Sequence, residues 1–278
     1  MVERHLAKVN VASSNLVFRF QNAHFGVRFL FFDCHKEQMM KRMLSCLRQT
    51  IQKYNMIEHN DKIAVAVSGG KDSFVLLDAL FILKKFYPIS FEIGAIYIDI
   101  GFETNNSKAI ENYCIEKNIN FICEKTQIKQ VAFDEMNLKN PCSLCSRMRR
   151  AALCETAILN GYNKIALGHN RDDANETLVL NLIHNGKIEC FEPKTYYEDK
   201  DIKIIRPLIA IPEYQINSYA KKQSLPVCRK ICPIDGFTDR QKIKMLLREL
   251  SKGNREINKN IYSAIEKLEI FSSKETRD

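Results

Sequence analysis

Two groups of residues in this sequence have the types and spacing that chemistry requires. The first is the segment Ser68–Ser73, SGGKDS, which follows an apolar run at 62–67 and precedes another at 74–80. The first run has the length of a β-strand, and the second is typical of a helix. A glycine turn between a strand and a helix gathers backbone N–H groups at the positive end of the helix dipole. We therefore expect a phosphate site here.

Each residue type in this segment suits a phosphate site. Gly69 and Gly70 have no Cβ and let the backbone approach an anion closely. Lys71 can add positive charge, and Ser68 and Ser73 can add hydroxyl donors. The spacing differs from the GxxxxGK[ST] and GxGxxG loops of other nucleotide-binding folds. An ordinary turn with two glycines is the alternative, but six residues in this context favour the phosphate site.

The second group consists of cysteines. Cys142 and Cys145 form a CxxC pair just before the basic segment 147–150, and Cys228 and Cys232 follow much later. A CxxC pair brings two thiolates together, as in a redox pair, half a zinc site or half an iron–sulfur site. CxxxC is a poor zinc spacing, so the pattern favours three thiolates with an open fourth position.

The alternation of strand-like and helix-like segments predicts the scaffold that positions these groups. We expect an α/β fold with a doubly wound parallel sheet, Rossmann-like, with basic flanking helices and ligands at the carboxyl ends of its strands. Strands are predicted at 62–67, 93–99, 120–124, 164–167 and 201–205. Helices are predicted at 36–55, 74–85, 106–117, 147–159 and 212–223, and beginning near 174 and 242.

Polar or nucleotide-facing residues follow the predicted strands. Ile98 ends the second strand, and Gly168 and His169 follow the fourth. Asp172 and Asp173 come just before the next helix, where an acid is expected to cap the helix N-terminus. Capping needs only one acid, so the pair near a histidine favours an additional Mg²⁺ or catalytic role.

Composition limits the class of protein. The chain has 278 residues, 45% hydrophobic and 27% charged, and no apolar stretch long enough to span a membrane. We expect a soluble, cytoplasmic protein. The net charge of +9 favours a polyanionic partner, although a solvated basic surface explains it equally well. Ten cysteines without a secretion signal favour metal or sulfur chemistry over disulfides.

We expect three segments along the chain. Residues 1–38 are predicted to be an extension that the core does not need, because residues 16–32 are rich in phenylalanine without helical periodicity. An edge strand, disorder or translated upstream sequence would each fit. Residues 39–250 would form the nucleotide-binding domain with its sulfur chemistry, and residues 251–278 a C-terminal helical tail.

The loop resembles the pyrophosphate loop of the PP-loop ATP pyrophosphatase superfamily. With the other motifs, the chain resembles the tRNA 2-thiocytidine synthetase family over roughly residues 40–250. The motifs that carry this resemblance are, in order, SGGKDS, PCSLCSRMRR, GHNRDDANETLVLN, IIRPL and the late cysteine segment. Thiouridine-forming members usually carry extra zinc fingers at their ends, and their absence here favours the cytidine branch.

The resemblance implies a 4Fe-4S cluster held by three cysteines, two of them Cys142 and Cys145. For the third ligand, counting back from Asp239 favours Cys232 over Cys228. This chain departs from the family here, since members usually have CxxC where it has CRKIC. The choice between Cys232 and Cys228 therefore stays open at this point.

The resemblance also implies ATP-dependent thiolation of an anticodon-loop cytidine, with Mg²⁺ and with adenylation of the base before sulfur transfer. The catalytic residues implied are Asp72, Arg149 and Asp173. Arg149 replaces a family lysine, which favours charge stabilisation over proton transfer. The residues expected to bind ATP are Ser68, Gly69, Gly70, Lys71, Asp72, Ser73, Ile98, Gly168 and His169.

The implied partners are tRNA and a sulfur donor such as a cysteine desulfurase; whether a homodimer forms is open. The expected RNA-binding residues are Arg147, Arg149, Arg150, Lys242 and Lys244. A lysidine synthetase, a 2-thiouridine synthetase and a non-catalytic ATP-binding iron–sulfur protein are the alternative functions.

Overall fold

The computed structural model describes residues 26–102, 106–135, 141–228, 232, 238–254 and 256–267. The chain divides into two compact units, Met1–Gln38 and Met39–Asp278. Helix α1 (Gly26–Lys53) includes residues of both units. It begins well before the predicted start at Lys36, so the prediction of a strand or disorder was wrong for residues 26–32. The sheet and the candidate site belong to the second unit.

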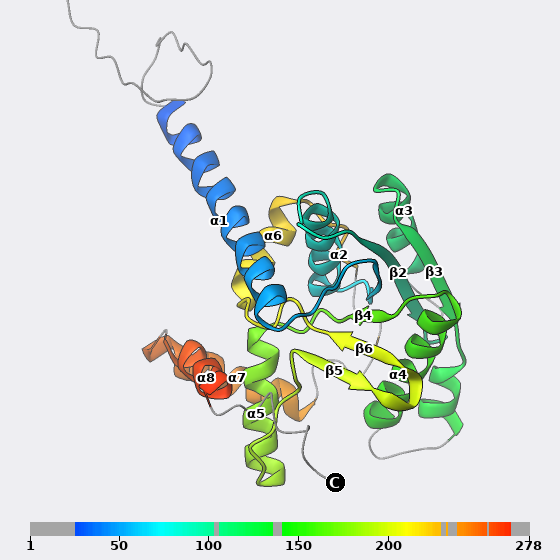
Figure 1. The fold of residues 1–278 in the computed structure, drawn as a ribbon. Helices are drawn as coiled ribbons and strands as arrows, with labels where there is room; N and C mark the ends of the chain where they lie inside the picture. Colours follow the sequence, from blue (N-terminus) through cyan, green and yellow to red (C-terminus); the bar gives the residue numbers. More distant parts are fainter. Residues whose placement is uncertain are drawn as a thin grey trace, which may run out of the picture. The chain divides into compact units, whose positions relative to one another are not determined.

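The second unit contains one sheet of six strands in the order β3-β2-β1-β4-β6-β5 (Figure 1). All neighbouring strands are parallel except β5 and β6, which are antiparallel. The predicted doubly wound parallel sheet is therefore confirmed, with one antiparallel edge. The strands are β1 (Asp61–Ala66), β2 (Phe91–Asp99), β3 (Asn120–Lys125), β4 (Lys164–Ala166), β5 (Lys194–Tyr197) and β6 (Ile202–Ile205).

Helices connect the parallel strands, as a crossover connection requires. They are α2 (Lys71–Lys84), α3 (Ser107–Glu116), α4 (Pro141–Leu159) and α5 (Arg171–Asn185). Three further helices follow the last strand: α6 (Glu213–Lys222), α7 (Asp239–Gly253) and α8 (Ile257–Lys267). A π-helical turn, Gln130–Glu135, and a 3-10 turn, Glu198–Lys200, complete the described elements. None of the helices in the described ranges is long and apolar enough to cross a membrane.

The core lies on both faces of the sheet. In β1, Ile63 and Val65 pack with α1, α2 and α6 on one face, whereas Ala64 packs with α4 on the other. This alternation follows from the period of two in a strand. Burial on both faces explains why the strand sequences are continuous apolar runs.

One strand was missed, and two helices begin earlier than predicted. Strand β5 was not predicted, because it is short and pairs only with β6 through a tight turn in which Asp201 has a positive φ of 47°. Helix α4 begins at Pro141 rather than Arg147, since proline is well suited to the first helical position. Helix α7 begins at Asp239, capped by the hydroxyl of Thr238.

Candidate ATP and thiolation site

The turn between β1 and α2 has the backbone that the glycines were predicted to supply. Gly69 has a φ of +84°, and a Cβ there would lie 2.6 Å from Nδ2 of Asn106. The Oγ of Ser73 donates a hydrogen bond of 2.8 Å to the Gly70 carbonyl and accepts one of 3.2 Å from the Ser68 N–H. Hydrogen bonds of its own serines therefore hold the loop in place, and helix α2 begins within it.

The end of β4 lies directly against this turn. A Cβ on Gly168 would lie 3.1 Å from the carbonyl carbon of Asp72 and 3.2 Å from the Ser73 nitrogen. A side chain here would push the two segments apart by a few tenths of an ångström, so glycine suits this close approach. The two segments therefore form the wall of one site.

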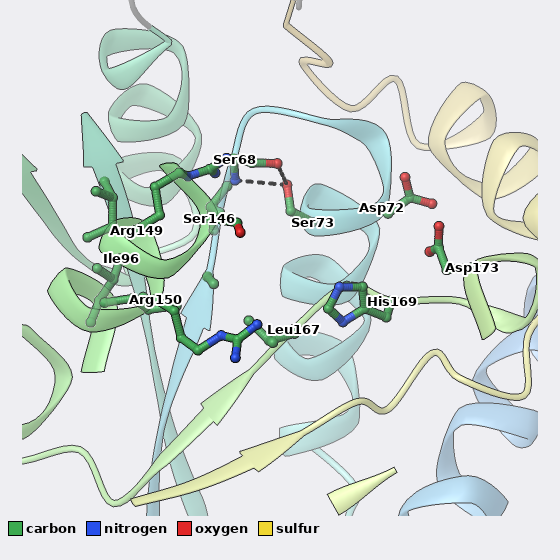
Figure 2. Close-up of a pocket in the computed structure, with 15 residues that line it drawn as sticks. Ser68, Asp72, Ser73, Ile96, Ser146, Arg149, Arg150, Leu167, His169 and Asp173 are labelled. Carbon is green, nitrogen blue, oxygen red and sulfur yellow. Dashed lines mark hydrogen bonds between the residues drawn. The ribbon is translucent and has the colours of Figure 1, made fainter. Parts of the chain in front are cut away.

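A cavity of about 390 Å³ opens between this wall and α4 (Figure 2). Its lining brings together predicted ATP-binding and catalytic residues from β1, β2, α2, α4, β4 and α5. The lining residues are Ala66, Val67, Ser68, Asp72, Ser73, Ile96, Ile98, Ser146, Arg149, Arg150, Leu153, Leu167, Gly168, His169 and Asp173. Of the predicted ATP-binding residues, Gly69, Gly70 and Lys71 do not line it.

The carboxyl groups of Asp72 and Asp173 lie beside each other at one side of the cavity (Figure 2). Burial and the nearby charge of Asp72 raise the pKa of Asp173 above its usual value. Asp173 also accepts a hydrogen bond of 2.9 Å from the Asn170 N–H, in a capping box at the start of α5. Asp172 is directed elsewhere: its Oδ2 accepts from the Glu213 N–H at 2.7 Å. The expected capping of α5 by both acids was therefore wrong: Asn170 is the N-cap, Asp173 completes the capping box, and Asp172 binds the first residue of α6 instead. Asp173 faces Asp72 as well.

Lys71 is held by acids beside the cavity. Its Nζ lies 3.0 Å from Oδ2 of Asp72 and 2.9 Å from Oε1 of Glu213. Burial would raise the pKa of Glu213, but hydrogen bonds from Lys244 and Lys71 lower it to about 2. Sequence reasoning missed Glu213; the only local signal is an acid in the first turn of a helix after Pro212.

His169 is neutral in this environment. Burial, together with the charge of Arg206, lowers the pKa of His169 to about 3. Its ring stacks on Phe191 with 4.8 Å between ring centroids, and the Arg206 guanidinium lies 5.2 Å from the Phe191 centroid. The buried Nδ1 of His169 has no hydrogen-bond partner in the described part of the chain.

Helix α4 joins the cysteines to the cavity. Cys142 and Cys145 lie in its first turns, while Ser146 and Arg149 line the cavity. Arg150 is exposed and donates a hydrogen bond of 3.3 Å to the Tyr197 hydroxyl.

Cys232 lies near the CxxC pair. Burial and then the thiol of Cys232 raise the pKa of Cys142, and burial raises that of Cys145, with Cys232 adding to the effect. Burial alone raises the pKa of Cys228, whose Sγ lies 3.4 Å from the Pro226 carbonyl oxygen. The thiol of Cys232 therefore lies close enough to Cys142 and Cys145 to affect their pKa values. In the ranges described above, no three Cys, His, Asp or Glu side chains are close enough to hold a metal ion as they stand.

The remaining predicted residues lie outside the cavity. Arg147 is exposed on α4. The side chain of Lys242 is 78% exposed and pairs with Asp239, whereas that of Lys244 is only 23% exposed and pairs with Glu213. The two lysines of α7 thus face different surroundings.

This loop, cavity and sheet order define the class of protein as a PP-loop nucleotide-binding domain. A family model described as a PP-loop domain matches residues 38–229. A tRNA-cytidine(32) 2-sulfurtransferase of Geotalea uraniireducens is 35% identical over 83% of this chain and 92% of its own length. A tRNA-cytidine(32) 2-sulfurtransferase 1 of Francisella tularensis is 36% identical over 84% of this chain and 88% of its own length.

A solved structure extends this similarity. The U34-tRNA thiolase NcsA from Methanococcus maripaludis, determined with its [4Fe-4S] cluster, has a TM-score of 0.72 and 27% identity. The match covers 84% of this chain and 79% of that one. The chain belongs to the PP-loop family and, within it, to the tRNA-cytidine(32) 2-sulfurtransferases.

Proposed function

We propose that this protein is an ATP-dependent tRNA sulfurtransferase that converts a cytidine of the anticodon loop to 2-thiocytidine. The names of its relatives point to position 32 of the tRNA. The observation that carries the proposal is the shared helix α4, which presents Ser146 and Arg149 to the PP-loop cavity and Cys142 and Cys145 beside it. Activation of the base and delivery of sulfur can then occur within one site.

The PP loop would bind the triphosphate of ATP. The backbone of Gly69 and Gly70, the N-terminus of α2 and the hydroxyls of Ser68 and Ser73 supply donors for it. Lys71 would move from its acids to the phosphates. Ile98, Gly168 and His169, which line the cavity, would contact the nucleoside.

Asp72 and Asp173 would hold Mg²⁺. Burial raises the pKa of Asp173, and the charge of Asp72 adds to that effect. A divalent cation between the two neighbouring carboxylates would offset both their burial and their repulsion. Oxygen ligands and phosphates are what Mg²⁺ prefers. When bound, the cation would neutralise charge at the α-phosphate.

Base activation would follow in this pocket. The C2 oxygen of cytidine attacks the α-phosphorus, the bond to the β-phosphate oxygen breaks, and pyrophosphate leaves, so that the base becomes adenylated. Arg149 would stabilise the charge that develops on phosphorus. Because its guanidinium does not lose a proton at neutral pH, it serves as an electrostatic rather than an acid–base group.

Cys142, Cys145 and Cys232 would hold a 4Fe-4S cluster. The charge of Cys232 affects the pKa of both Cys142 and Cys145, which supports this grouping. When bound, the cluster would supply an iron position for the sulfur that replaces the adenylated oxygen. The protein's own contribution is to keep these thiols beside the cavity through the first turns of α4.

The tRNA would approach over the basic residues of α4 and α7, with its target base turned out of the loop. Arg147, Arg149, Arg150 and Lys242 have exposed charge for this role. Lys244 would first have to leave Glu213. A cysteine desulfurase as sulfur donor, a cytoplasmic location, a homodimer and the segment boundaries at residues 38 and 250 remain predictions.

Release of AMP tests the proposal. Anaerobically purified protein that is supplied with ATP, Mg²⁺ and inorganic sulfide should release AMP and pyrophosphate only when tRNA is present. The substitution Asp173→Asn should slow this release by roughly 100-fold, because a ligand of the activating cation is lost. Lys259→Met, on exposed α8, is the matched control. AMP release that needs free lysine would favour a lysidine synthetase, and no turnover would favour a non-catalytic iron–sulfur protein.

A further inference from the structure

One carboxylate oxygen connects the PP loop to helix α7. Oε1 of Glu213 accepts a hydrogen bond of 2.9 Å from Nζ of Lys71 and another of 2.9 Å from Nζ of Lys244. Oε2 of Glu213 lies 3.5 Å from Nη2 of Arg248. The Glu213 side chain is only 15% exposed, so its charge depends on these cations rather than on water.

Helix α7 directs one basic face at the acids of the site. Arg240, Lys244 and Arg248 recur every four residues and therefore share one face of the helix. Nη2 of Arg240 donates a hydrogen bond of 2.8 Å to Oγ1 of Thr177, and its Nη1 lies 3.9 Å from Oδ1 of Asp173. Through these contacts α7 packs against Glu213, which also binds Lys71, and against the first turns of α5.

ATP binding would draw Lys71 away from Glu213. A buried carboxylate that loses its partner is costly, because it has already lost its hydration. Lys244 and Arg248 remain beside Glu213 when Lys71 leaves, and so they reduce that cost. We propose that Glu213 and Lys244 are positioning residues that form a relay, through which the docking of α7 determines how readily Lys71 moves to the phosphates.

This inference rests on the proposed binding of ATP by the PP loop, and it differs from a direct contact of Lys244 with nucleotide or RNA. A relay acts through Glu213 and disappears when Glu213 is neutral. A direct contact would remain. The distinction can be measured without tRNA, with Mg²⁺ and a non-hydrolysable ATP analogue.

The experiment compares the dissociation constants of the analogue for wild type, four variants of Lys244 and Glu213, and one control variant. Lys244→Met should weaken binding by on the order of tenfold, because Glu213 then retains Lys71 more firmly. Glu213→Gln should bind at least as tightly as wild type, because a competitor for Lys71 is gone. The double variant should match Glu213→Gln within about twofold. Lys244→Arg should bind the analogue almost as tightly as wild type. Methionine and arginine both keep an unbranched stem, so a difference between these two variants would show that the charge of Lys244 matters.

Other outcomes would overturn the relay. Lys244→Met could have no effect, or could weaken binding equally in the Glu213→Gln background; the second result would mean that Lys244 acts directly. Glu213→Gln with lost affinity would contradict the competition for Lys71. Lys259→Met is the control, and thermal unfolding of each variant separates misfolding from altered binding. A wild type that binds no analogue would overturn the proposed function and the relay together.

Discussion

Asn170 and Asp72 are joined by a hydrogen bond of 3.1 Å from Nδ2 of Asn170 to Oδ1 of Asp72. The same asparagine caps α5, since its Oδ1 accepts from the backbone N–H groups of Asp172 at 2.9 Å and Asp173 at 3.1 Å. Asn170 is 3% exposed. It therefore fixes the relative position of the two carboxylates proposed to hold Mg²⁺.

Replacing Asn170 separates its two roles. Asn170→Ser keeps a capping oxygen but loses the donor to Asp72, so stability should stay close to wild type while AMP release falls roughly tenfold. Asn170→Ala should also lose about 1 kcal/mol of stability with the cap. Denaturant unfolding and AMP release measure the two effects. Wild-type turnover in Asn170→Ser would show that Asp72 needs no such support.

The cysteine assignment predicts a difference between two nearby residues. Cys232→Ala should lose most of the iron and acid-labile sulfide of anaerobically purified protein, because the charge of Cys232, unlike that of Cys228, affects the pKa values of Cys142 and Cys145. Cys228→Ala should retain about the wild-type content of both. Iron that survives Cys232→Ala but not Cys228→Ala would reverse the assignment.

A buried ion pair at the start of β1 and β4 predicts a large effect on stability. Nζ of Lys164, which is fully buried, lies 2.7 Å from Oδ2 of Asp61 and 3.0 Å from Oε2 of Glu58. Lys164→Met leaves Asp61 buried without its cation and should cost about 3–5 kcal/mol. Lys203→Met removes a more exposed partner of Glu58, 3.5 Å away, and should cost less than about 1 kcal/mol. Equal losses in urea unfolding would contradict this account.

The buried carboxyl group of Glu176 should make the stability of the protein depend on pH. Burial raises its pKa from 4.5 to about 7, although Lys244 opposes the shift. The folded state holds this proton more firmly than the unfolded state. The proton on Glu176 therefore stabilises the folded state fully below the pKa of Glu176 in the unfolded state. This stabilisation is lost as the pH rises through the pKa of Glu176 in the folded state. Glu176→Gln should gain stability over wild type, on the order of 2 kcal/mol, between about pH 5 and about pH 8. A constant difference over this range would count against the assignment.

The parallel sheet and the PP loop could be predicted because their signals are local. SGGKDS lies between two apolar runs, and Asp173 follows a buried strand, so each group could be assigned to the same edge of the sheet. The cavity brings together Ser68, Ile98 and His169 as expected from that rule.

The missed features depend on packing between distant segments. Glu213 reaches Lys71 only because α6 packs against α2, and no spacing in the sequence records that contact. Phe191 likewise contacts His169 and Arg206 just before β5, the strand that the sequence analysis did not predict. Lys242 and Lys244 looked equivalent in the sequence, but one is exposed and the other is bound to an acid.

The most direct test of the central claim is nucleoside analysis by mass spectrometry of tRNA incubated with the cluster-loaded protein, ATP, Mg²⁺ and inorganic sulfide. The account predicts 2-thiocytidine in the anticodon loop, formed only with ATP. It also predicts that Asp173→Asn and Cys232→Ala form little of it. Unmodified tRNA, 2-thiouridine or lysidine as the product would contradict the account.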